Sequence, residues 1–194
     1  NNDDLKTNTM KTEQKIKAIN EGWTLVNGTP IADLESYIFN QLATKPGTKV
    51  SIGTDGSIKT GGGDEDDSIK SKTVRYEKKA KKVKYLTVIV FRTKGIPCVN
   101  HVIIRRDDET KFGHVPTAVK LNGEINRTSE LALWYRDAIK MDPEVHLDVN
   151  PNESAGSFEV YKYIKGYFES LGFEVEYKPT GDATTASCVA DYFL

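Results

Sequence analysis

Two aspartates stand at the ends of segments rich in strand-forming residues. Asp55 directly follows 49–54, and Asp148 lies near the end of 144–149. If these strands are parallel neighbours, their carboxyl ends meet at one edge of a sheet, where open α/β sheets bind ligands. Two carboxylates held close together raise each other's pKa unless a cation binds, and hard oxygen ligands suit Mg²⁺ or Mn²⁺. The alternative for Asp55 is that Asp-Gly, which opens DGSIKTGGG, marks a turn.

Two further acids fall on predicted helices. Glu130 is expected in the first turn of a helix over 127–140, where an acid compensates the helix dipole. Because Glu130 shares a stripe with apolar residues that should face the sheet, we favour a site residue. Asp191 lies late in the last helix, on a face of small residues that allows close approach to the sheet. The alternatives are a solvated acid at that position, or Asp182 in its place, although Asp182 better suits a helix N-cap.

His146 lies two residues before Asp148 and should point the same way in a strand. It is expected to be a half-buried structural histidine, with a supporting role beside the site as the alternative.

The composition is that of an ordinary α/β protein, with 38% hydrophobic and 28% charged residues and a net charge of −1. No apolar run approaches the roughly 20 residues of a membrane span, and the polar start lacks a secretory signal. These features predict a cytoplasmic protein with no membrane partner. Charge is uneven, however, because KKAKKVK contains Lys78, Lys79, Lys81 and Lys82. These lysines either form a solvated surface or contact the phosphates of a nucleic acid.

Hydrophobic periodicity and turn residues predict a first helix followed by the order β-β-β-α-β-α-β-α. Helices are expected at 30–44, at 127–140 with Thr128 as N-cap, at 158–171 with Gly172 as C-cap, and at 183–193. Strands are expected at 49–54, 85–92, 98–106, 144–149 and 173–178, with an irregular connection over 107–126. The predicted fold is α/β: a mixed five-stranded sheet with flanking helices and an extra N-terminal helix.

Two regions are expected along the chain. Residues 1–29 form a polar N-terminal arm that is partly disordered. Residues 30–194 form the folded domain, with a mobile, glycine-rich loop at 56–73.

Three stretches carry a resemblance to a known family: IGTDG (52–56), HLDVNPNESAGS (146–157) and KPTGDATTASCVADYF (178–193). Together they resemble the ribonuclease H-like superfamily and, within it, the YkuK-type group of predicted ribonuclease H-like proteins. The resemblance covers roughly residues 34–194 and implies the ribonuclease H-like fold. It also implies that Asp55, Glu130, Asp148 and Asp191 are the catalytic, metal-binding carboxylates, and that Lys178 matches the lysine of a Lys-Pro motif.

Two function classes follow. The first is a metal-dependent nuclease, whose four carboxylates hold two Mg²⁺ or Mn²⁺ ions about 4 Å apart and hydrolyse phosphodiester bonds. Its substrate phosphates would meet Lys178 and the lysine run. The second is a catalytically inactive module of the same fold that binds nucleic acid or a protein, because fold alone does not fix function. RNA, DNA and their hybrid remain open as partners, as does the oligomeric state.

Overall fold

A computed structural model describes residues 14, 16–60, 80–93, 101–150, 152, 158–177 and 186–194 of the chain. Its labelled elements, in chain order, are β1 (Trp23–Leu25), α2 (Leu34–Thr44), β2 (Thr48–Thr60), β3 (Ala80–Thr93), β4 (His101–Phe112), α3 (Thr117–Ile139), β5 (Glu144–Leu147), α4 (Phe158–Ser170), β6 (Val175–Tyr177) and α5 (Ala186–Phe193). No helix in this described part of the chain is both long and apolar enough to span a membrane.

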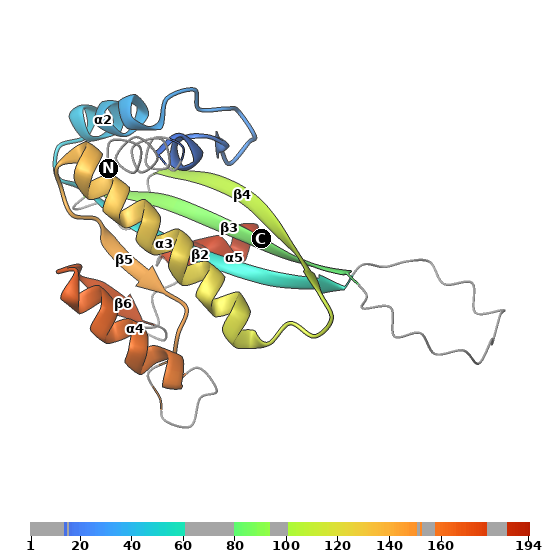
Figure 1. The fold of residues 1–194 in the computed structure, drawn as a ribbon. Coiled ribbons are helices and arrows are strands. Elements are labelled where there is room, and N and C mark those ends of the chain that lie inside the picture. Colours follow the sequence, from blue (N-terminus) through green and yellow to red (C-terminus); the bar gives the residue numbers. More distant parts are fainter. Residues whose placement is uncertain are drawn as a thin grey trace, which may run out of the picture.

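The strands form one mixed sheet in the order β1-β4-β3-β2-β5-β6 (Figure 1). β1, β4, β3 and β2 pair antiparallel, whereas β5 pairs parallel with both β2 and β6. The mixed α/β sheet is therefore confirmed, with one strand more than the five predicted. The added strand is β1, which lies within residues 1–29 and pairs with β4; its Trp23 is 1% exposed.

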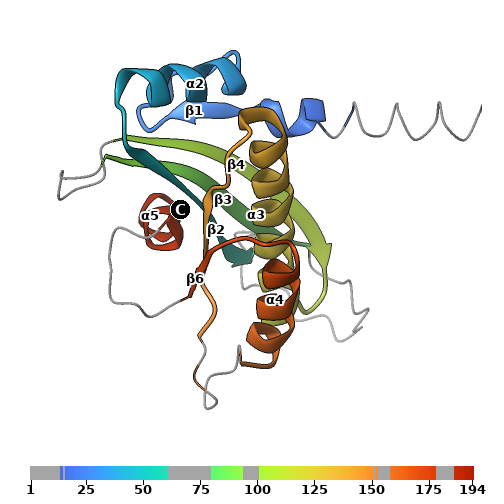
Figure 2. The same ribbon diagram turned by 90° about the vertical axis from the view of Figure 1, so that its left-hand side faces the viewer.

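Helices cover both faces of the sheet (Figure 2). α3 and α4 lie on one face and α5 lies on the other. The larger apolar core is on the first face, where strand residues such as Ile52 and Ile89 pack with residues of α2, α3 and α4. A smaller core joins Leu86 and Val88 of β3 to Ala186 and Ala190 of α5. The sheet is thus buried unequally, and α5 is held by the smaller core.

The three central strands are longer than the sequence predicts. β2 continues past Asp55 to Thr60, and β4 continues to Phe112. Residues 56–60 are therefore strand and not part of a loop, and Asp55 lies inside a strand and not at its end. Alternation explains the extension: beyond the core, β3 still buries Val83 and Tyr85, whereas Lys82 is exposed and Lys84 is half-buried. The rest of the predicted loop, from residue 61, falls outside the described residues.

The predictions of an irregular connection over 107–126 and of a helix starting at Thr128 are wrong. α3 begins at Thr117, directly after the N-cap Pro116, and runs for 23 residues. Polar residues crowd its first half, so the apolar stripe that begins at Leu121 and Ile125 is hard to recognise in the sequence. Thr128 lies in mid-helix.

Thr128 does not cap a helix but joins three elements. Its Oγ1 donates to Thr54 Oγ1 of β2 at 2.9 Å, and Thr54 donates to Thr87 Oγ1 of β3 at 3.1 Å. All three hydroxyls are buried, and buried polar groups need such partners. The chain of hydroxyls fixes α3 against the strand that carries Asp55.

The remaining elements follow the predicted order. α2 starts at Leu34 and not at Pro30, because Asp33 caps it by accepting a hydrogen bond from Ser36 N at 3.0 Å. The predicted C-cap Gly172 has φ +74°, as expected of a glycine that ends a helix. The prediction of Asp182 as the N-cap of the last helix lies outside the described residues, and that helix is described from Ala186.

Candidate functional site

β2 continues beyond the point where its pairing with the parallel strand β5 stops. β5 pairs parallel with β2 over Ser51–Gly53, so the condition set for the two aspartates holds, but the next residues of β2 have no β5 partner. Asp55 lies there, two residues beyond the last pair, and is 5% exposed. Asp148 directly follows β5, and continuing the register would place it opposite Asp55. The two predicted aspartates thus come to the same edge of the sheet.

The carboxylate that α3 brings to this edge is that of Glu124, a residue that sequence reasoning missed. Glu124 is 3% exposed, and its Oε1 lies 2.8 Å from the ammonium of Lys120, one turn earlier on α3. That ammonium lies 3.6 Å from Asp55 Oδ1. The i,i+4 Lys-Glu spacing would have indicated this face of α3, had a helix been predicted there.

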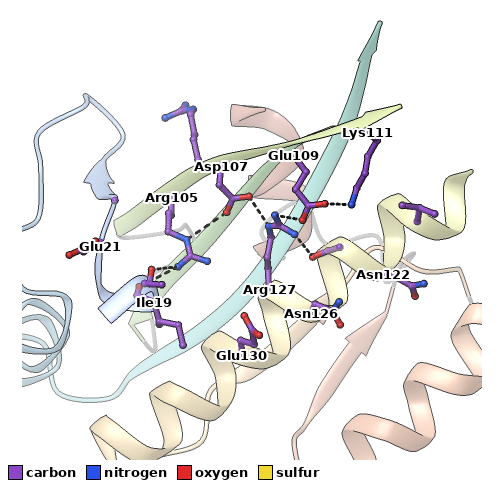
Figure 3. Close-up of a pocket in the computed structure, with 15 residues that line it drawn as sticks. Ile19, Glu21, Arg105, Asp107, Glu109, Lys111, Asn122, Asn126, Arg127 and Glu130 are labelled. Atoms are coloured by element: carbon purple, nitrogen blue, oxygen red, sulfur yellow. Dashed lines mark hydrogen bonds and ion pairs between the residues drawn. The ribbon is translucent and has the colours of Figure 1, made fainter. Parts of the chain in front are cut away.

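Glu130 lies elsewhere. It is six residues from Glu124, and at 3.6 residues per turn the two side chains point about 120° apart. Glu130 is exposed and lines a surface cavity of about 920 Å³ with Arg105 and Arg127 (Figure 3). The expectation that its stripe faces the sheet is wrong for Glu130 itself.

Two glycines allow α3 to approach the strands. A Cβ on Gly123 would lie 2.1 Å from Tyr85 Oη, and one on Gly56 would lie 3.0 Å from Glu124 Oε1. Arg127 completes this contact, with its guanidinium carbon 3.7 Å from the centre of the Tyr85 ring. Asp55 and Gly56 do not form a turn, because both lie within β2. The lack of a side chain at Gly56 leaves room for the Glu124 carboxylate.

α5 brings Asp191 to the same region from the opposite face of the sheet. The first turn of α5 lies directly on Gly53, where a Cβ would stand 2.8 Å from Ser187 N. Asp191, one turn after Ser187, is exposed and acts electrostatically on Asp55. Of the small residues expected to share its face, Ser187 is buried, and the apolar contacts of α5 with the sheet are made by Ala186, Val189 and Ala190.

His146 positions α5. It is fully buried, and its Nδ1 accepts a hydrogen bond from Ala186 N at 2.7 Å, so that nitrogen carries no proton. The ring thus satisfies a backbone donor of the first turn of α5. The sequence predicts a half-buried structural histidine; His146 is instead fully buried, and it anchors the helix of Asp191.

Burial and like charges disturb the carboxylates of the site. Burial raises the pKa of the Asp55 carboxyl. The negative charges of Asp148 and Asp191 raise this pKa further, whereas Lys120 and the Gly56 N–H lower it. Burial also raises the pKa of Glu124 to about 7, with Asp55 and Asp148 adding to the effect and Lys120 opposing it. A bound cation would stabilise the ionised form of acids in such surroundings.

Comparison with known proteins supplies a family. A family model described as Ribonuclease H-like matches residues 77–194, more than half of the chain. The chain belongs to the ribonuclease H-like family. No curated protein and no solved structure matches.

The ribonuclease H-like match includes Glu124, Asp148 and Asp191, but it starts after β2 and so does not include Asp55. Asp55 is nevertheless part of the same sheet as the matched segment, because β2 pairs with β3 and β5 and both of these strands lie within the match. The resemblance to the ribonuclease H-like superfamily is confirmed.

Ribonuclease H-like proteins often use divalent metals, and the donors around Asp55 fit such an ion. Carboxylate oxygens are the ligands that Mg²⁺ and Mn²⁺ prefer, and the Lys120 ammonium already marks a cation position among them. One group of three possible ligands is tightly spaced in the described part of the chain. The ligand atoms of Glu144, His146 and Glu176 all lie within 4.8 Å of one another. The carboxylates around Lys120 are spaced more widely than that.

The trio of Glu144, His146 and Glu176 has other partners. Glu144 is paired with Lys49 at 2.6 Å and Arg92 at 3.2 Å, and one nitrogen of His146 is used by α5. We therefore treat the trio as an ion-pair network that supports β5.

The lysine run is divided between two faces of the β2–β3–β4 ribbon. Lys82 lies opposite Lys59 of β2, on the face that carries Asp55, because alternate residues share a face and paired residues face the same way. Lys81 lies on the other face with Val83 and Tyr85. Lys78, Lys79 and Lys178 lie outside the described residues.

Proposed function

We propose that this chain is a divalent-metal-dependent nuclease that hydrolyses phosphodiester bonds. The observation that carries the proposal is the convergence of four carboxylates from separate parts of the fold. Asp55 comes from β2, Glu124 from α3, Asp148 from the end of β5 and Asp191 from α5. Acids gathered in this way are unfavourable unless a cation is bound, so the arrangement is typical of a metal site.

The four carboxylates would hold two ions, Mg²⁺ or Mn²⁺. Asp55 interacts electrostatically with Glu124, Asp148 and Asp191, so it would be the carboxylate available to both ions. Glu124 replaces Glu130 as the helix carboxylate in this proposal. When bound, such ions activate a water and stabilise the leaving oxygen of the phosphodiester. The α5 helix would contribute Asp191 to the set.

Substrate would lie along the face of the ribbon that Asp55 shares. Beyond Asp55 this face carries Lys59, Lys82 and Lys84, two to four residues further along the paired strands. Strand residues two apart are separated by about 7 Å, which is about twice the 3.4 Å axial rise per phosphate of one strand of duplex DNA. A backbone leaving the carboxylates would therefore meet a row of ammonium groups. Lys82 already binds an anionic group, since it pairs with Asp108 at 3.2 Å.

The two faces of the ribbon provide a matched test of this substrate path. Lys59→Gln with Lys82→Gln should weaken binding of a nucleic acid in EDTA and reduce the slope of log affinity against log salt concentration by about 2. Lys81→Gln with Lys111→Gln removes the same charge from the opposite face and should leave that slope unchanged. Equal slopes for the two double variants would contradict the assigned path.

The nuclease itself is tested with labelled single-stranded DNA, duplex DNA, single-stranded RNA and RNA–DNA hybrid, each with Mg²⁺, Mn²⁺ or EDTA. We expect cleavage of at least one substrate that requires the metal. Asp55→Asn should reduce its rate by at least about 10²-fold, because metal-bound charge stabilisation is worth several kcal/mol and 1.4 kcal/mol is tenfold in rate. The variant should remain folded. Cleavage at the parental rate by Asp55→Asn would show that these carboxylates are not the site.

A nucleic-acid-binding module is the second candidate, and the contact of Lys120 with Glu124 favours it. That ion pair already neutralises part of the site without any metal. If no substrate is cut with either metal and binding is unchanged in EDTA, the module becomes the better description.

A further inference from the structure

The ammonium of Lys120 lies among the oxygens of the carboxylate cluster. Its Nζ is 2.8 Å from Glu124 Oε1 and 3.6 Å from Asp55 Oδ1, and it donates a hydrogen bond to the Gly56 carbonyl oxygen at 2.9 Å. Carboxylate and carbonyl oxygens are also the ligands of Mg²⁺ and Mn²⁺. Lys120 thus occupies a position that a divalent ion bound to Asp55 and Glu124 would need.

The two acids depend on this ammonium. Their side chains are 7% and 4% exposed, and carboxylates so far removed from water need a paired charge. In the described part of the chain, their ion pairs involve Lys120 alone. Asp148 also acts electrostatically on Lys120, so one ammonium serves three carboxylates.

A divalent ion and the ammonium exclude each other at these oxygens. Both are cations, and like charges a few ångströms apart at a partly buried site repel strongly. Lys120 can leave, because its side chain is 21% exposed and its charge is carried on a flexible four-carbon stem. Its removal would free oxygens on both acids and on Gly56 together.

We propose that Lys120 is an internal competitor of the divalent ion. It neutralises Asp55 and Glu124 in the metal-free protein and is displaced when an ion binds them. This inference rests on the proposed function, since it concerns the same carboxylates. It explains how four acids fold together without metal, and it makes the affinity for metal weaker than these carboxylates alone would give.

The test is isothermal titration of Mn²⁺ into the parent, Lys120→Met and Lys140→Met. Methionine keeps an unbranched stem and removes the charge. Lys120→Met should bind Mn²⁺ at least about tenfold more tightly, because the ion no longer displaces a charge-assisted hydrogen bond. Lys140 is an exposed residue at the end of the same helix, so its variant controls for net charge and should bind Mn²⁺ as the parent does.

The outcomes separate this inference from the proposed function. If the parent and Lys120→Met bind Mn²⁺ with equal affinity, the competition is overturned and the metal site stands. If neither protein binds Mn²⁺, the metal site is overturned, and the competition with it.

A second measurement uses only the parent protein and decides the matter if Lys120→Met fails to fold. Reductive methylation of lysines, read by mass spectrometry, is compared in EDTA and in Mg²⁺. Lys120 should be protected in EDTA and should react several-fold faster in Mg²⁺. Lys49, which contacts Glu144 at 2.6 Å, provides an internal reference that should not change. Equal reactivity of Lys120 in the two conditions would overturn the displacement.

Discussion

Glu124→Gln should reduce metal-dependent cleavage by at least about 10²-fold, whereas Glu130→Gln should leave the rate within about twofold of the parent. Glu124 is buried beside Asp55 and shares its ammonium partner, so its charge is available to a metal ion. Glu130 is exposed and lies in the cavity with Arg105 and Arg127. The measurement is the cleavage rate at saturating Mg²⁺ on the substrate that the panel identifies.

The pair of variants forms its own control. Both replace a glutamate of α3 with its neutral amide, so the net charge and the helix propensity change equally. Folding is checked by the melting temperature of each variant in EDTA. A large loss of rate in Glu130→Gln with little loss in Glu124→Gln would restore the assignment that the family resemblance implies and would remove Glu124 from the site.

Gly53→Ala should disable the site without changing any carboxylate. The new methyl group would lie 2.8 Å from Ser187 N and 2.9 Å from the Ala186 carbonyl carbon, both backbone atoms of α5. Because a helix backbone does not yield as a side chain tip does, α5 must shift away from the sheet. Overpacking of this kind costs about 1–3 kcal/mol of stability, and a displacement of about 1 Å at a reacting group can cost about 10²-fold in rate.

Gly166→Ala is the matched control for that substitution. Gly166 lies on α4, and no atom stands within 4 Å of the Cβ that it would gain. Alanine is favoured over glycine inside a helix by about 1 kcal/mol, so this variant should be slightly more stable and fully active. The melting temperature and the Mn²⁺ affinity of the two variants are compared. Gly53→Ala with parental values of both would show that α5 does not need its close approach to β2.

Local pattern predicted the parts of the site that depend on strand order. Asp55 and Asp148 each end a segment rich in strand-forming residues, and the alternation of helices and strands favours a parallel pairing of the two segments. The parallel pairing of β2 with β5 confirms that step. The small-residue face of the last helix similarly indicated that α5 would lie close to the sheet.

Local pattern could not predict that Glu124 is the carboxylate that α3 contributes. The first half of α3 is polar because it lines a charged cavity on one side and the carboxylate cluster on the other, so little apolar periodicity remains. Polar residues also alternate with other residues along the outer halves of β2, β3 and β4. Contacts between distant residues, such as Thr128 with Thr54 or His146 with Ala186, leave no local sequence signal at all.

The unequal burial of the sheet has a consequence for how the protein opens. α5 is held by the smaller apolar cluster and by the bond from Ala186 to His146, whereas α2, α3 and α4 share the larger core. Cooperative units with few buried contacts open at a lower free energy than the whole fold. Detachment of α5 would therefore be a sub-global event that removes Asp191 while β2, β5 and α3 keep the other three acids in place. Any ion that binds both Asp55 and Asp191 would hold α5 against the sheet. Occupancy of the site and the local stability of the last helix would then be thermodynamically linked.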